Sequence, residues 1–255
     1  MTAPSAERLL RVIEDEGRAM LDLVGGDLTR PVPSCPGWTV AELVGHLTAV
    51  YRWVTLIVGE RRFERPTASQ RAALDVPVLD GPALSRVFET AHTKVVATLR
   101  DAPTDLACWT MWPAASARDY WIRRQAHETL VHHVDLRTAT VGSTLDCVHV
   151  GADIAADGVD EMVMGFAGRY REQLRSPRPA TIALHATDAD RRWWIRLGPT
   201  EPEFGRGEVD DTDQTVLRAR GGELLLLLWN RRDWDGLDVT GADEPLRSWR
   251  RTAHL

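Results

Sequence analysis

The stretch RDYWIRRQAHETLVHHVDLR, residues 118–137, decides the fold that we expect for this chain. Its apolar spacing predicts one long amphipathic helix. Glu128 and His132 stand four residues apart, so a carboxylate and an imidazole lie one turn apart on the same helical face. Helical bundles build their sites from such inward side chains, and the stretch therefore predicts both a bundle and a site within it.

A second predicted helix supplies another residue of this kind. Thr39 and Glu42 form a capping-box signature, with threonine at the N-cap and glutamate three residues later, so a helix begins here. His46 lies in its second turn, flanked by apolar residues. We therefore expect His46 to join the first pair in a set of two histidines and one carboxylate.

Two further helices complete the pattern in the first part of the chain. Apolar residues recur at helical period over residues 5–24 and 80–102. Prolines at 31, 33 and 36 predict an extended connector, and the polar residues 60–70 predict a loop. Four helices with modest connections are typical of a four-helix bundle, which we place at residues 1–142.

The pattern changes after residue 142. Residues 143–255 are expected to form a separate α+β domain with a short mixed or antiparallel sheet. Its predicted elements are a helical stretch at 152–170, strands at 181–186, 192–197, 214–219 and 237–240, and a helix at 223–230.

The composition excludes several function classes. The net charge is −6 and both signs are interspersed, so no basic surface for nucleic acid or an anionic membrane is indicated. The longest apolar run, residues 224–229, is far too short to span a membrane. Three scattered cysteines and the lack of a signal-peptide pattern favour a reducing cytoplasm. Lys94 is the only lysine against 30 arginines, a bias that suggests a bacterium with GC-rich coding DNA.

The two-histidine, one-carboxylate set favours a metal site. An ionised Glu128 inside a bundle is costly unless it is paired or bound to a cation, and one cation satisfies all three side chains. Two nitrogens and one oxygen suit Zn²⁺, and three protein ligands leave a fourth position open, as in catalytic sites. Non-haem Fe(II) uses the same ligand types.

The two histidines next to these candidate ligands in the sequence are not expected to bind the metal. His127 and Glu128 resemble the start of the HExxH zinc-protease motif, but Val131 stands where the second histidine belongs. His127 and His133 each lie about 100° around the helix from a ligand, so we expect them to be structural or exposed.

Two further residues near the set are interpreted from their position. Asp135 follows His132 by nearly one turn, so it either orients that histidine or forms an exposed helix salt bridge. Cys35 precedes the second helix, and we expect a buried structural thiol there.

Three segments together resemble the mycothiol-dependent maleylpyruvate isomerase family, and the resemblance spans nearly the whole chain. The segments are PSCPGWTVAELVGHL (33–47), HETLVHHVD (127–135) and RGGELLLLLWNR (220–231). The resemblance implies a DinB-like four-helix bundle that binds zinc or another divalent metal through His46, Glu128 and His132. It also implies that an arginine after the penultimate helix aids catalysis. The family has Gly-Arg there and this chain has Asn230-Arg231, so we assign the role to Arg231 rather than to Arg232.

The resemblance implies that the open metal position takes the thiol of mycothiol, a thiol of actinobacteria. The thiolate would then attack a small electrophile, and we place S-transferase ahead of cis–trans isomerase of the maleylpyruvate type. A non-catalytic metal- or ligand-binding sensor and a zinc hydrolase are the alternatives. Mycothiol and the electrophile are the expected partners of a monomer or homodimer.

Overall fold

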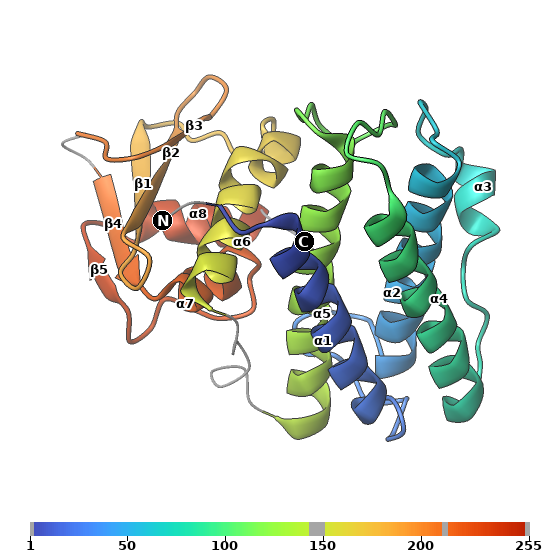
Figure 1. The fold of residues 1–255 in the computed structure, drawn as a ribbon. Coiled ribbons are helices and arrows are strands. Elements are labelled where there is room, and N and C mark those ends of the chain that lie inside the picture. Colours follow the sequence, from blue (N-terminus) through green and yellow to red (C-terminus); the bar gives the residue numbers. More distant parts are fainter. Residues whose placement is uncertain (1–2, 143–150, 211–213, 253–255) are drawn as a thin grey trace. The chain divides into compact units, whose positions relative to one another are not determined.

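The structure, a computed structural model, describes residues 3–142, 151–210 and 214–252. The chain divides into two compact units, Ser5–Cys147 and Val148–Leu255, the second together with residues 1–4 (Figure 1). The predicted domain boundary at residue 142 adjoins residues 143–150, which lie outside the described residues, and it stays a prediction. No helix among the described residues is both long and apolar enough to cross a membrane.

The first unit is a bundle of four long helices, as predicted. Helix α1 contacts α4 and α5, and α2 contacts the same two helices, so the four run side by side (Figure 1). The helices of this unit are α1 (Ala6–Leu23), α2 (Val40–Gly59), α3 (Ala68–Ala72), α4 (Gly81–Asp101) and α5 (Ala117–Val141).

Helix α5 is not amphipathic, contrary to the prediction. All residues from 129 to 136 are buried, so no face of this part of the helix is open. The buried polar side chains are tolerated because they pair with one another and with other helices, as His133 does with Glu16 of α1. A helix with polar groups buried on several faces is unusual, and it marks α5 as the place to look for a site.

Two connections differ from the predictions. The proline-rich connector is not extended: it folds back on itself, Pro31 and Thr39 form an isolated β-bridge, and Gly37 takes the left-handed φ of +87° that the reversal requires. The stretch predicted as a loop at residues 60–70 includes the start of α3. That helix begins at a capping box of Thr67 and Gln70, but it is too short to bury any residue.

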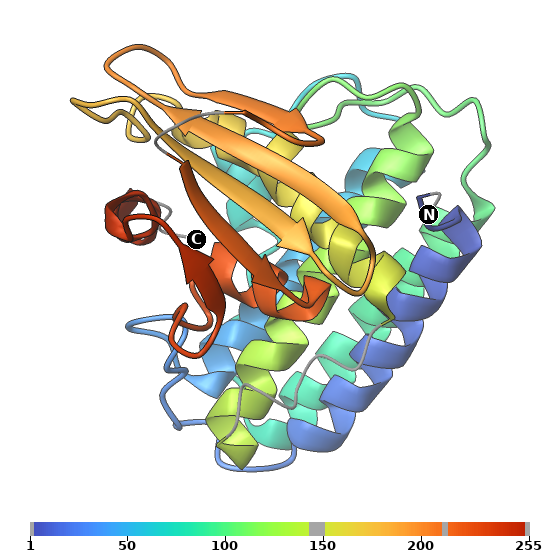
Figure 2. The same ribbon diagram turned by 90° about the vertical axis from the view of Figure 1, so that its left-hand side faces the viewer.

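The second unit is an α/β domain built on a mixed sheet, as predicted. The strand order is β3-β2-β1-β4-β5, with β1 and β4 parallel and the other pairs antiparallel (Figure 2). Its elements are α6 (Ala152–Met164), a 3-10 helix (Phe166–Tyr170), β1 (Ala180–Ala186), β2 (Arg191–Leu197), β3 (Glu203–Arg206), β4 (Gln214–Ala219), α7 (Gly221–Leu228), β5 (Asp238–Thr240) and α8 (Glu244–Thr252).

The predictions for this unit missed or misjudged several elements. The helical stretch at 152–170 is two helices, because the α-helix ends at Met164, before Gly165. Strand β3 and helix α8 were not predicted. The strands at 181–186, 192–197, 214–219 and 237–240 were predicted to within one residue.

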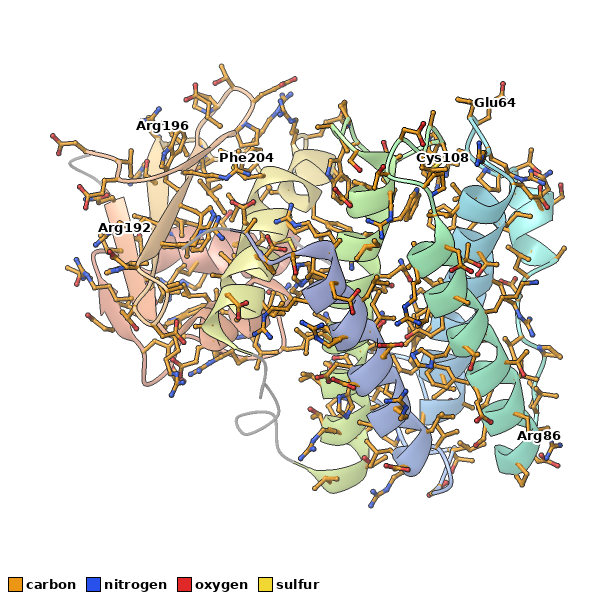
Figure 3. All side chains as sticks on the ribbon, viewed as in Figure 1. Glu64, Arg86, Cys108, Arg192, Arg196 and Phe204 are labelled. Atoms are coloured by element: carbon orange, nitrogen blue, oxygen red, sulfur yellow. The ribbon has the colours of Figure 1, made fainter. Side chains whose placement is uncertain are left out.

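The charged residues on one face of β2 are paired. Arg192 and Arg196 are four residues apart and so share a face of the strand (Figure 3). Arg192 pairs with Asp190 at 3.0 Å, and Arg196 pairs with Glu203 at 2.9 Å. The charge of each of these two guanidinium groups is therefore balanced by a neighbouring carboxylate.

Candidate metal centre

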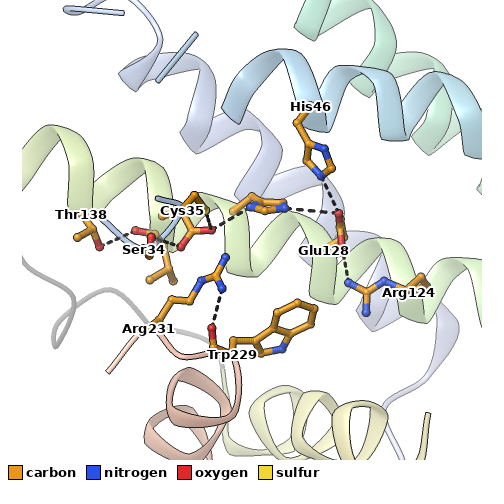
Figure 4. A network of polar contacts seen from close by, with 11 residues as sticks. Ser34, Cys35, His46, Arg124, Glu128, Thr138, Trp229 and Arg231 are labelled. Carbon is orange, nitrogen blue, oxygen red and sulfur yellow. Dashed lines mark hydrogen bonds and ion pairs between the residues drawn. The ribbon is translucent and has the colours of Figure 1, made fainter. Parts of the chain in front are cut away.

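Glu128 is held by only one of its two carboxylate oxygens. Arg124, one turn earlier on α5, donates from Nη2 to Oε2 of Glu128 at 2.6 Å, and its side chain is only 3% exposed. The other oxygen, Oε1, lies 3.4 Å from Nε2 of His46 and 3.5 Å from Nε2 of His132 (Figure 4). One oxygen is therefore committed to an ion pair, and the other faces two imidazole nitrogens.

The distances among these three ligand atoms suit a shared cation better than hydrogen bonds. Charge-assisted hydrogen bonds of this type are usually about 2.7–2.9 Å long. In a tetrahedral zinc site with bonds of about 2.0–2.1 Å, neighbouring ligand atoms are about 3.3 Å apart. The three candidate ligand atoms all lie within 4.8 Å of one another. The donor set thus fits a divalent metal with three protein ligands.

Asp135 orients His132 from the side opposite to Glu128. Nδ1 of His132 donates to Oδ2 of Asp135 at 2.9 Å, and the carboxylate is completely buried. Ser34 donates to the other oxygen of Asp135 at 2.6 Å. With a proton held on Nδ1, Nε2 is the ring nitrogen of His132 that faces Glu128, and it is the nitrogen that a metal would bind. Of the two interpretations of Asp135, the exposed salt bridge is therefore wrong.

The pKa values reflect this pairing in the protein without a cation. Burial opposes the ionisation of Glu128, but Arg124 and the two histidines hold the pKa of Glu128 well below its usual range. Burial lowers the pKa of His132, but the hydrogen bond that it donates to Asp135 and the nearby carboxylate of Glu128 outweigh this effect and raise that pKa to about 9. A metal at this position therefore competes with a proton on His132.

Helix α2 brings His46 to the site. The predicted capping box is present: the backbone N–H of Thr39 donates to Glu42 at 2.7 Å, and the N–H of Glu42 donates to the threonine hydroxyl at 3.4 Å. This fixes the start of α2, and His46 follows in its second turn. The ring of His46 lies 4.8 Å from that of Trp38 and 5.1 Å from that of His132, centroid to centroid.

The other predicted polar residues of the bundle are structural. His127 is completely buried, and His133 pairs through Nδ1 with Glu16, away from the ligand set. Cys35 is buried, as expected, and its thiol donates to Asp135 at 3.5 Å. His133 thus lies apart from the set formed by His46, Glu128 and His132, whereas Cys35 adjoins it: the ligand atoms of Cys35, His132 and Asp135 also lie within 4.8 Å of one another.

Arg231 belongs to the second unit. Asn230 has a left-handed φ of +59°, a conformation that asparagine, like glycine, tolerates at the end of a helix. Nη1 of Arg231 donates to the carbonyl of Trp229 at 2.6 Å (Figure 4). Arg232 pairs with Glu223 of α7 at 2.8 Å, which gives it a structural role within its own unit. The catalytic role of Arg231 stays a prediction.

The sequence interpretation missed two residues that support the site. Arg124 stands four residues before Glu128, a spacing at which opposite charges pair on a helix, so its signal was present in the sequence. Ser34 had no such signal, because its contact with Asp135 joins positions 101 residues apart.

Comparisons with known proteins agree with the fold of both units. Residues 10–137 match the family model for the mycothiol maleylpyruvate isomerase N-terminal domain, and residues 153–247 match the model for the C-terminal domain of the same enzyme. The fold is similar to the crystal structure of the mycothiol-dependent maleylpyruvate isomerase, with a TM-score of 0.66, and to that of its histidine-to-alanine mutant, with 0.67. Each is 14% identical, and each alignment covers 94% of this chain and 96% of the other. No curated protein sequence gave a match.

Proposed function

Because the chain belongs to the mycothiol maleylpyruvate isomerase family, we propose that it is a mycothiol-dependent metalloenzyme whose cation is held by His46, Glu128 and His132. Zinc is the expected metal. The observation that carries the proposal is the convergence of three ligand atoms within 4.8 Å, at separations that suit a tetrahedral cation. Three protein ligands leave a fourth position for the thiol of the cosubstrate.

The residues around the ligands prepare them for this role. When bound, zinc lowers the pKa of a coordinated thiol and keeps it as the thiolate at neutral pH. Arg124 keeps Glu128 ionised, and Asp135 holds the proton of His132 on Nδ1. Glu128 is thereby kept in the form that binds a cation, and Nε2 of His132 is the ring nitrogen that a metal would bind in place of a proton.

The proposed reaction is attack of the thiolate on a small electrophile. In an S-transferase, which we favour, the new C–S bond persists: the electrophile loses a leaving group, or a conjugated double bond takes up a proton at the neighbouring carbon. In an isomerase, the thiolate adds to a conjugated cis double bond, the resulting single bond rotates, and the thiolate is expelled. Arg231 is proposed to bind a carboxylate or the developing enolate oxygen of the substrate.

Metal analysis and calorimetry test the proposal together. The purified protein should hold one divalent ion per chain, and His46→Ala should lose it while keeping its helical circular dichroism. Mycothiol should bind the metal-loaded protein with release of a proton, and more tightly than cysteine or glutathione. Mycothiol carries hydroxyl-rich sugar and inositol groups, so polar contacts that smaller thiols lack should give this selectivity.

Three results would contradict the proposal. Stoichiometric metal in His46→Ala would remove that histidine from the site. Equal affinity for the three thiols, or binding that survives metal removal, would favour a hydrolase that uses water or a non-catalytic sensor.

For Arg231, replacement by lysine should lower the rate of thiol consumption, because only a guanidinium forms bidentate contacts. The matched Arg232→Lys should leave that rate unchanged.

A further inference from the structure

We propose that Cys35, Asp135 and His132 form a second cation position, which takes a thiophilic divalent ion and competes with the first position for His132. The competition rests on the proposed function, since it concerns the ion held by His46, Glu128 and His132. The second position stands on its own geometry. Its three ligand atoms all lie within 4.8 Å of one another, and all three residues are buried.

The carboxylate of Asp135 presents one oxygen to two other ligand atoms. Ser34 donates to Oδ1 at 2.6 Å and so holds one side of the carboxylate. The other oxygen, Oδ2, lies 2.9 Å from Nδ1 of His132 and 3.5 Å from Sγ of Cys35 (Figure 4). Glu128 is arranged in the same way, with one oxygen held by a neighbour and the other facing two ligand atoms. Asp135 therefore repeats the pattern of a candidate ligand.

The distances at Oδ2 are compatible with a cation between these atoms. On zinc, with bonds of about 2.3 Å to sulfur and about 2.0–2.2 Å to oxygen, neighbouring sulfur and oxygen ligands are about 3.6 Å apart. The 3.5 Å between Sγ of Cys35 and Oδ2 of Asp135 agrees with this value. The 2.9 Å contact with Nδ1 of His132 is a hydrogen bond, and it must lengthen by about 0.5 Å when an ion replaces the proton.

Backbone hydrogen bonds hold the thiol in place. Cys35 lies in the connector that folds back on itself between Pro31 and Thr39. The N–H of Cys35 donates to the carbonyl of Val32 at 3.0 Å, and the carbonyl of Cys35 accepts from the N–H of Trp38 at 3.0 Å. A ligand on a chain held in this way loses little conformational freedom when an ion binds.

The ligand types select the class of ion. Sulfur is a soft ligand, so a set that includes a thiolate favours thiophilic ions over the hard ions that bind carboxylate and water. The thiolate of Cys35 and the carboxylate of Asp135 together cancel the charge of a divalent ion. A buried position needs this balance, because an uncompensated charge there is costly. Cd²⁺ meets both conditions and serves as the probe.

His132 belongs to both positions, so they cannot be filled together. A neutral imidazole has a lone pair on one ring nitrogen and a proton on the other. An ion on Nδ1 takes the place of the proton there, and the thiol proton of Cys35 passes to solvent. The ring then keeps its proton on Nε2, the nitrogen that faces Glu128. Because Nε2 is no longer a ligand, a thiophilic ion should expel zinc rather than add to it.

Cadmium titration of the zinc-loaded protein tests the inference through the ultraviolet absorption band of the cadmium–thiolate bond. Both metals are measured by elemental analysis after gel filtration. The band should grow to one thiolate-bound cadmium per chain while zinc falls in proportion. In Cys35→Ser the band should be absent. At least about tenfold more cadmium should then be needed to release zinc, since even groups outside the ligand set contribute about 10–100-fold to metal affinity.

Further variants serve as controls. The chain has three cysteines, so Cys108→Ser combined with Cys147→Ser leaves Cys35 as the only thiol, and the band should persist there at full intensity. His46→Ala changes the first position alone, so it should lose zinc and keep the cadmium band. Cys35→Ala, which adds no polar group, is measured beside Cys35→Ser. Circular dichroism and melting temperature are recorded for every variant.

The outcomes separate the two proposals. A band that survives in folded Cys35→Ser or Cys35→Ala, or that is lost from the double cysteine variant, would overturn the second position. Zinc and thiolate-bound cadmium held together, one each per chain, would overturn the competition for His132. A wild-type protein that binds no zinc but shows the band when titrated without metal would overturn the proposed function and support the second position.

Discussion

Asp160 in the second unit and Glu128 in the bundle are both carboxylates on helices, with side chains 5% and 15% exposed, but their partners differ. Oδ1 of Asp160 accepts from Nε1 of Trp193 at 2.9 Å and from Nε of Arg206 at 2.6 Å, while Oδ2 accepts from Nη2 of Arg206 at 2.8 Å. Glu128 has one oxygen paired with Arg124, and its other oxygen lies 3.4–3.5 Å from two histidine nitrogens.

The difference teaches how a structural acid is distinguished from a candidate ligand. Both oxygens of Asp160 are engaged at hydrogen-bond distance, so this carboxylate ties α6 to β2 and β3. Glu128 keeps one oxygen at the spacing of metal ligands rather than of hydrogen bonds. The charge is the same in the two cases, and the completeness of the hydrogen bonding is the feature that separates them.

The largest expected effect concerns Glu128. Replacing it with glutamine removes the anionic ligand, so metal affinity should fall by more than the 10–100-fold that supporting groups around a metal site contribute. Competition with a fluorescent chelator measures the affinity. If Glu128→Gln bound metal as tightly as the wild type, the contrast with Asp160 would have no functional meaning.

The next effect concerns Asp160, and it should appear in stability instead. Asp160→Asn leaves the buried Nε1 of Trp193 and the guanidinium group of Arg206 with a weaker acceptor, so the second unit should lose about 2–3 kcal/mol of unfolding free energy. Urea unfolding, with hydrogen exchange of the amides in β1 and β2 as the probe, measures the loss. Asp238→Asn is the control, because its pair with Arg218 is exposed and 3.8 Å long, and it should change stability by less than about 1 kcal/mol. Metal affinity should change in neither variant.

The smallest effect concerns His92, a third buried polar group, which like Asp160 is committed to a structural partner. Its Nε2–H donates to the carbonyl oxygen of Ile13 at 2.9 Å, and its ring lies against Gly17, where an added Cβ would come within 2.3 Å. Burial lowers the pKa of His92 below its ordinary value of 6.5. The unfolded chain therefore takes up the proton more readily than the folded one.

The sign of the pH dependence follows from this. The contribution of His92 to stability is fully present above pH 6.5 and is lost as the pH falls from there through the folded-state pKa. The stability of the wild type should thus fall more steeply than that of His92→Gln in this window. Unfolding curves of both proteins at several pH values measure the difference. Parallel curves would mean that His92 does not titrate differently on folding.

Much of the bundle was predictable from the sequence because its signals are local. The capping box at Thr39 and Glu42 fixed the start of α2, and the spacing of Glu128 and His132 placed two candidate ligands on one face of α5. Periodicity failed for α5 itself, because buried polar pairs on several faces mask the apolar stripe that a bundle helix normally shows.

The remaining features depend on contacts that no local pattern encodes. Helix α3 has five residues and strand β3 has four, too few to establish a period. Helix α8 is an exception: Leu246 and Trp249, three residues apart on its buried side, gave an amphipathic pattern, but over only nine residues, and the prediction overlooked it. The contact of Asp135 with Ser34 could not be predicted, because the two residues are 101 positions apart in the sequence. The family resemblance, in contrast, indicated the fold of both units, since it does not depend on local periodicity.

His46 and Glu128 are 82 positions apart in the chain, whereas Glu128 and His132 share one turn. An unfolded chain must close a long loop to bring all three together, and the entropy cost of that closure leaves it with the local pair alone. A cation that needs all three ligands therefore binds the folded bundle in preference to the unfolded chain, and adds about 2.7 kcal/mol to the stability of the fold at a free concentration a hundred times its Kd. Metal supply in the cell would then govern the amount of folded protein that survives proteolysis, in addition to its activity.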